Sequence, residues 1–159
     1  MLEIAEIDKP FRDLSYILLA NEVKRLGMSI NLPFAVFTDK TKLWANALSK
    51  EMPWLVKTEK ALQSFRIRID KIEETKDLYL NIREAYGRTP SGYITDIQVI
   101  IPEENREVER EIYRAFGELL RNSDLLLFDL HITKLRGRKV TEVIPEGFWR
   151  YGWTSSHIS

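Results

Sequence analysis

Residues 93–132 constrain the fold most, because three hydrophobic patterns follow one another within them. From Tyr93 to Ile101 the apolar positions Ile97, Val99 and Ile101 alternate with polar ones, which predicts a strand. An amphipathic helix is predicted over about 103–121, after Pro102. A nearly continuous apolar run over 125–132 then predicts a strand buried on both faces. The chain must therefore build a sheet with at least one helix packed on it.

The preceding residues extend this sheet. Phe65, Ile67 and Ile69 alternate with charged residues and predict a strand over 65–72. A second strand over 77–83 follows the polar residues 73–76, and the two together predict an antiparallel hairpin. A helix over 78–86 is the alternative, because the apolar residues there also fit a period of 3.6. Nearer the N-terminus we expect a strand at 2–7 and helices at 10–26 and 43–48.

This order of elements is typical of an α+β domain around a mixed, mostly antiparallel sheet flanked by helices. The length of 159 residues fits one domain, which we expect to span 1–159. No cysteine is present, so a disulfide scaffold, a thiol nucleophile and a cysteine-based metal site are excluded. The 24 Lys and Arg balance the 24 Asp and Glu, which argues against binding to nucleic acid or an anionic membrane. With no apolar segment long enough to span a bilayer and no signal-like N-terminus, we expect a cytoplasmic protein.

The segment Asp96-Ile-Gln-Val-Ile-Ile-Pro-Glu-Glu-Asn-Arg-Glu-Val-Glu-Arg-Glu-Ile-Tyr113 resembles the GNAT N-acetyltransferase superfamily. Gly147-Phe148 also lies where that family often has Gly-Phe. The resemblance implies a GNAT-like fold, acetyl-CoA as cofactor, and a small-molecule or peptide amine as acceptor. It assigns the pantetheine arm to Val99, Ile100 and Ile101. The pyrophosphate would lie at the first helical turn, at Arg106, Glu107, Val108, Glu109 and Arg110.

A helix N-terminus suits this role, because its unpaired N–H groups and partial positive charge attract phosphate. The chain departs from the family pattern where glycines are usual, since Glu107 and Glu109 occupy those positions. Two carboxylates beside a pyrophosphate would oppose its binding. The chain thus resembles a divergent member, and a catalytically inactive GNAT-like binding or interaction module is the alternative function.

Two residues are candidates for proton transfer. Asp96 is expected to act as the base that accepts the proton of the acceptor amine, directly or through a water. Tyr151 is the candidate proton donor at the C-terminal edge of the cleft. The structural alternatives are a polar residue on a solvated sheet face for Asp96 and an interfacial aromatic for Tyr151.

A Mg²⁺-dependent nuclease with a PD-(D/E)xK-like core is a third hypothesis. In it, Asp77 and Asp96 would hold the metal and Gln98 would replace the usual lysine. The histidines, His131 and His157, are not accompanied by a metal-ligand pattern of carboxylates and make a weak metal site, so we expect no metal there.

The C-terminal part carries a basic cluster and several aromatics. Lys134, Arg136, Arg138 and Lys139 form either an anion-binding loop or a solvated turn. The aromatic residues near the C-terminus, Trp149, Tyr151 and Trp153, suggest a subunit contact, and hence a homodimer.

Overall fold

The computed structural model describes Leu14, Leu18 and the ranges 52–75, 77–85, 87, 92–123 and 126–151. The elements expected at 2–7, 10–26 and 43–48 lie outside the described residues, apart from Leu14 and Leu18, which are helical and buried. Two compact units divide the chain, one of Met1–Lys60 with Gly152–Ser159 and one of Ala61–Tyr151. The sheet and the candidate site belong to the second unit.

The strand predicted over 65–72 is wrong, because these residues continue a helix, α3, that spans Pro53–Asp70. Pro53 occupies its first turn, where a proline costs no backbone hydrogen bond. Phe65 and Ile69 are buried, whereas Ile67 between them is 59% exposed. Burial at i and i+4 but not at i+2 is the helical period, which the alternation of charged residues had concealed. The predicted 65–72 hairpin is therefore absent.

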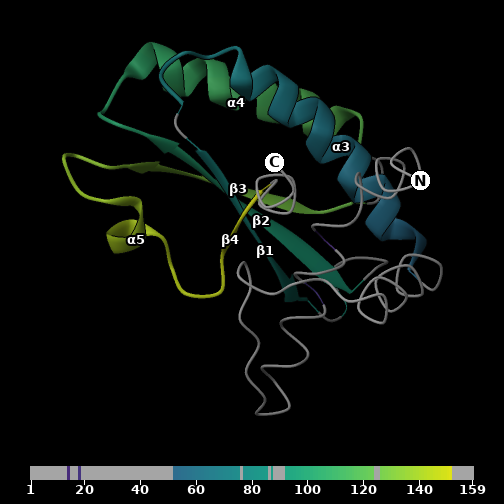
Figure 1. Cartoon of the computed structure of the whole chain (residues 1–159). Coiled ribbons are helices and arrows are strands. Elements are labelled where there is room, and N and C mark those ends of the chain that lie inside the picture. Colours follow the sequence, from purple (N-terminus) through teal and green to yellow (C-terminus); the bar gives the residue numbers. More distant parts are fainter. Residues whose placement is uncertain are drawn as a thin grey trace, which may run out of the picture. The chain divides into compact units, whose positions relative to one another are not determined.

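Within the described residues, a sheet of four strands in the order β3-β2-β1-β4 forms the centre of the second unit (Figure 1). Strand β1 (Asp77–Glu84) pairs antiparallel with β2 (Tyr93–Ile101), which confirms both predicted strands and rules out the helix over 78–86. Strand β3 (Phe128–Lys134) pairs parallel with β2, and the short β4 (Trp149–Arg150) pairs antiparallel with β1. Helices combined with this mixed sheet confirm the α+β class.

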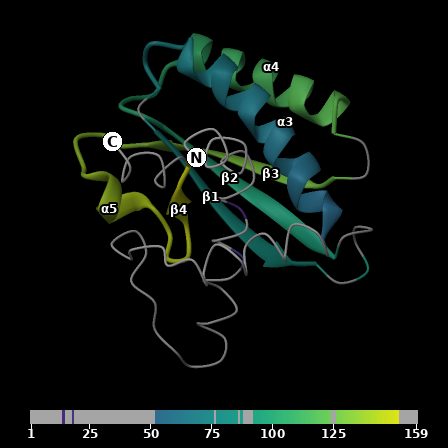
Figure 2. The ribbon, with the colours of Figure 1, turned by 45° about the vertical axis from the view of Figure 1, so that its right-hand side comes forward.

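Helix α4 spans Arg106–Arg121 and begins later than predicted, because Asn105 caps it. The Asn105 side chain accepts a hydrogen bond from the Val108 amide over 3.2 Å. One face of α4 is buried and consists of Val108, Ile112, Ala115 and Leu119. Helix α4 and the part of α3 from Ala61 onward lie side by side over one face of the sheet (Figures 1 and 2). Phe65 and Phe116 join them through an edge-to-face contact with ring centroids 6.3 Å apart.

The two faces of the sheet differ sharply in chemistry. Rows of paired residues across β1, β2 and β3 are apolar on one face: Leu80–Ile97–Leu130 and Leu78–Val99–Ile132. Lys134 shares that face by alternation and pairs with Glu109 of α4, so the apolar face is the one under the helices. On the opposite face the rows are polar: Asn81–Asp96–Asp129 and Tyr79–Gln98–His131.

Strand β3 differs from the prediction in position and burial. It starts at Phe128, after the predicted start at 125, and Asp129 and His131 on it are exposed. The expectation of burial on both faces is wrong, because one side of β3 belongs to the polar face of the sheet, where Asp129 and His131 are exposed. Between β3 and β4 lies only a short helix, α5 (Val140–Val143).

The helical period of α3 leads to a direct test. Phe65→Ala should destabilise the protein by about 3–4 kcal/mol, because it opens a cavity in the contact with Phe116. Ile67→Ala should change the free energy of unfolding by less than about 0.5 kcal/mol, since Ile67 is exposed. Urea denaturation measures both values. Equal losses in the two variants would contradict the helix, because a strand would bury both residues alike.

Candidate functional site

The residues assigned to the pantetheine arm lie inside the sheet. Val99, Ile100 and Ile101 are all 0% exposed. Strand β2 has β1 on one side and β3 on the other, so both edges of its backbone are paired. An extended ligand binds as an added strand only at a free edge. These three residues therefore form core rather than an open ligand surface.

The parallel pairing of β2 with β3 continues to the end of both strands. Its register runs from Thr95 opposite Phe128 to Ile101 opposite Lys134. Beyond it, the Leu135 amide donates to the Ile101 carbonyl over 2.9 Å and the Arg136 amide to the Pro102 carbonyl over 2.8 Å. The strands stay hydrogen-bonded where a splayed pair would separate, so no wedge opens between them.

The first turn of α4 is capped by protein groups. The Val108 amide donates its hydrogen bond to the Asn105 side chain, and Val108 itself is buried. Glu109 pairs with Lys134 at 3.3 Å, while Glu107 is exposed. The negative charge of Glu109 is thus offset within the fold.

A hollow of about 500 Å³ lies along the N-terminal half of α4, lined by Glu104, Asn105, Arg106, Glu109, Arg110 and Tyr113. Both of its acids are ion-paired, Glu104 with Arg136 and Glu109 with Lys134. Within the described part of the chain, Arg106 and Arg110 have no hydrogen-bonded or ion-paired partner. The uncompensated charge of the hollow is positive, which suits an anionic group.

The predicted base, Asp96, lies on the polar face of the sheet and is bound by an arginine. Arg83 Nε lies 2.8 Å and 3.1 Å from the two Asp96 carboxylate oxygens, and Arg83 Nη2 lies 2.5 Å from Asp129 Oδ2. Partial burial raises the pKa of Asp96, Arg83 acts in the opposite direction, and Asp129 adds to the increase. Asp96 could accept a proton from an amine only if Arg83 moved away.

Tyr151, the predicted proton donor, lies on the other face. Its ring centroid is 5.0 Å from the Arg66 guanidinium carbon, and Arg66 belongs to α3. Its backbone carbonyl also accepts a hydrogen bond from Arg66 Nη1 over 2.6 Å. Because α3 covers the apolar face and Asp96 points to the polar face, the sheet separates the two residues.

The metal pair of the nuclease hypothesis is not assembled either. Asp77 pairs in register with Ile100, four residues along β2 from Asp96, which corresponds to about 13 Å. Asp77 also forms an ion pair with Arg150 at 2.7 Å. Among the described residues, no cluster of three or more His, Asp or Glu could hold a metal ion.

The basic cluster lies at the end of β3 and in the turn that follows, and it neutralises glutamates at the start of α4 and just before it. Lys134 and Arg136 pair with glutamates, and Arg138 donates to the carbonyls of Lys134 and Leu135 over 3.1 Å and 3.0 Å. Arg136 and Gly137 have positive φ angles of 51° and 81°, as a tight turn requires. Three of the four cations predicted as an anion-binding loop are thus engaged within the fold.

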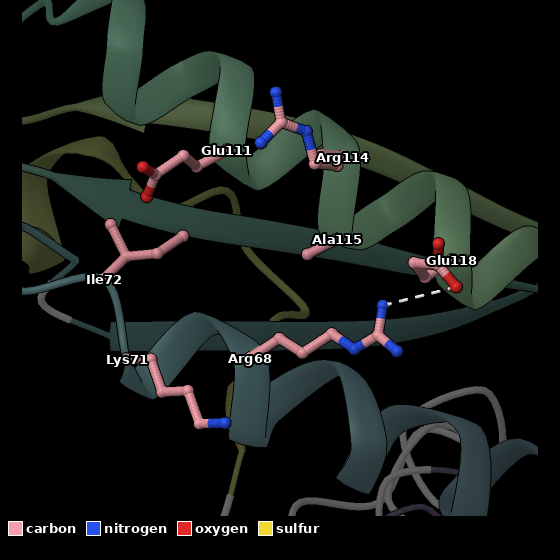
Figure 3. Close-up of a pocket in the computed structure, with 7 residues that line it drawn as sticks. All are labelled: Arg68, Lys71, Ile72, Glu111, Arg114, Ala115 and Glu118. Carbon is pink, nitrogen blue, oxygen red and sulfur yellow. Dashed lines mark ion pairs between the residues drawn. The ribbon is translucent and has the colours of Figure 1, made fainter.

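A second hollow of about 290 Å³ lies between α3 and α4 (Figure 3). Arg68 of α3 bridges it through an ion pair with Glu118 of α4 at 3.5 Å. None of the predicted site residues lines it. Its size is at the lower end of the usual range for ligand pockets.

No protein family, curated protein or solved structure that we compared matches the chain. Within the described residues, helices long and apolar enough to cross a bilayer are absent. What the chain binds must therefore be argued from its own surfaces.

Sequence reasoning missed three residues that define these surfaces. Arg83 and Asp129 meet Asp96 only through the parallel pairing of β2 with β3, which no local pattern reveals. Tyr113 had a local signal, because it is a large aromatic on the polar side of an amphipathic helix, seven residues after Arg106.

The Arg83–Asp96 contact predicts a shift in titration. Arg83→Gln should raise the pKa of Asp96 further, because the lost hydrogen bond and charge both favour the ionised carboxylate. A raised pKa in the folded state means that the contribution of Asp96 to stability is full below its ordinary value of 3.8 and is lost as the pH rises through the raised pKa. In the variant this loss should therefore extend to higher pH.

Carboxyl ¹³C chemical shifts followed against pH measure this pKa. Arg150→Gln is the matched control, because it frees Asp77 and leaves Asp96 untouched. An Asp96 pKa that is the same in wild type and Arg83→Gln would show that the contact does not form in solution.

Proposed function

We propose that this chain is a non-catalytic binding module that recognises an anionic partner through the N-terminal half of α4. The single observation that carries this proposal is the charge of the hollow. Its two glutamates are neutralised by Lys134 and Arg136, while Arg106 and Arg110 remain unpaired within the described residues. Guanidinium groups with unused donors bind carboxylate or phosphate in a bidentate manner.

The arrangement of the predicted catalytic residues favours binding over catalysis. Proton transfer requires the base and the acid to reach the same reacting atoms. Asp96 is held by Arg83 on the polar face, and Tyr151 packs against Arg66 on the helix face. The chain has no cysteine, which is compatible with the cytoplasmic location that belongs to this proposal.

An acyl-CoA-dependent N-acetyltransferase is the second proposal, with acetyl-CoA as cofactor and an amine as acceptor. One observation favours it: α4 starts directly after β2 and leads into the parallel strand β3, with Arg106 and Arg110 at the start of the helix. The hydrogen bonds that continue past Ile101 oppose it, because the pantetheine arm would need those backbone groups. For this reason we rank it below the binding module.

Acetyl-CoA and a simple polyanion distinguish the two proposals. Millimolar acetyl-CoA should raise the melting temperature no more than millimolar inorganic pyrophosphate does, whereas a specific ligand at 100 times its Kd would stabilise the fold by about 2.7 kcal/mol. Labelled poly-L-glutamate should bind, and the double variant Arg106→Glu/Arg110→Glu should weaken that binding roughly tenfold.

Lys57→Glu provides the control, because Lys57 is an exposed cation on α3 outside the hollow. It should bind poly-L-glutamate as tightly as the wild type does. Stabilisation by acetyl-CoA, with acetylation of an amine, would replace the binding module by the transferase. Equal effects of Lys57→Glu and the double variant would also contradict the module, since binding would then follow net charge alone.

A further inference from the structure

The outward side of α4 carries a second regular pattern besides its buried face. Arg106, Arg110, Tyr113, Gly117 and Leu120 follow one another at spacings of four, three, four and three residues. This spacing aligns them along one side of a helix over about 21 Å. We call these five residues the outer stripe.

The outer stripe is open and partly apolar. Tyr113 is 56% exposed and Leu120 is 46% exposed. Gly117 lies between them, and no atom comes within 4 Å of the position where its Cβ would stand. Two large side chains on either side of a glycine form a notch that a side chain of another helix fits.

Charges of both signs lie beside the stripe, with Glu107 at its N-terminal end and Arg114 further along. Arg114 follows Arg110 by one turn, and its guanidinium lies on the side of α4 away from α3 (Figure 3). Neither Arg114 nor the two arginines of the stripe has an ion-paired or hydrogen-bonded partner in the described ranges. Arg114 also borders the hollow between α3 and α4, where Glu111 and Glu118 lie with Arg68 and Lys71.

We infer that the outer stripe docks an acidic amphipathic helix of a partner protein. This inference rests on the proposed binding function and names the class of its partner. Apolar side chains of that helix would pack on Tyr113 and Leu120 and enter the notch at Gly117. Its carboxylates would pair with Arg106, Arg110 and Arg114. Two helices that pack along each other use alternating spacings of four and three residues, which is the spacing of the stripe.

Charge complementarity decides between this occupant and two others. A second copy of the chain would bring the same unpaired arginines into the interface and would supply no acid from its own stripe, so like charges would oppose the dimer. A nucleic-acid strand would use the arginines but would leave Leu120 and the notch at Gly117 without a role. An acidic helix with an apolar side uses every residue of the stripe.

The test uses the full chain and a designed peptide of about three heptads, with leucine at the first and fourth positions and glutamate and alanine elsewhere. Fluorescence anisotropy should show binding at least tenfold tighter than that of a scrambled peptide of the same composition. Gly117→Leu should fill the notch and remove this preference, while its binding to poly-L-glutamate stays unchanged. Arg110→Glu should weaken both peptide and poly-L-glutamate binding, the peptide about tenfold.

Controls keep the outcomes separable. Circular dichroism should show a folded protein in Gly117→Leu and Arg110→Glu, and neither melting temperature should fall much. Gly117→Leu should raise it somewhat, because glycine is a poor helix former. Lys57→Glu should bind the peptide as the wild type does.

If poly-L-glutamate binds but the designed and scrambled peptides bind equally, the proposal of a helical partner is overturned and the anion-binding module stands. If neither poly-L-glutamate nor the designed peptide binds, both the helical partner and the anion-binding module are overturned. The proposal of a helical partner would also be overturned if a single-stranded oligonucleotide bound more tightly than the peptide and lost that binding in Arg110→Glu.

Discussion

The parallel pairing of β2 with β3 is the constraint on which the rest of the unit depends. A parallel pair needs a crossover, and α4 is that crossover, so the position of the helix over the sheet follows from the pairing. The pairing continues into the turn, where Leu135 and Arg136 bind the carbonyls of Ile101 and Pro102. Backbone groups that a strand-like ligand would need are therefore used within the protein.

The same turn determines the charge of α4. By returning along the end of β2, it places Lys134 beside Glu109 and Arg136 beside Glu104. A helix rich in glutamate thereby presents unpaired arginines on its outward side, although the chain as a whole has no net charge. Local pairing, rather than overall composition, decides which ions such a surface attracts.

Local patterns predicted β1, β2 and most of α4. The period is clear in β2 and α4, which Pro102 separates, whereas the residues of β1 also fit a helical period. Local patterns failed at α3, where arginines at every second position imitated a strand between Phe65 and Ile69. Pro53 is no clear signal either, because a proline is typical both of a first helical turn and of the residues after a helix. Contacts such as Arg83 with Asp129 depend on which strands pair, and one sequence does not contain that information in any local form.

Amide hydrogen exchange in the native protein tests the central claim, the closed end of the β2–β3 pair, most directly. We expect the Leu135 and Arg136 amides to exchange slowly, within about tenfold of the amides in the middle of β2. The reason is that Leu135 donates to the carbonyl of Ile101, the last residue of β2, and Arg136 donates to the carbonyl of Pro102. Exchange of these two amides at the rate of an unprotected peptide, while β1 and β2 stay protected, would contradict this claim. The strands would then separate at that end and leave room for an extended ligand.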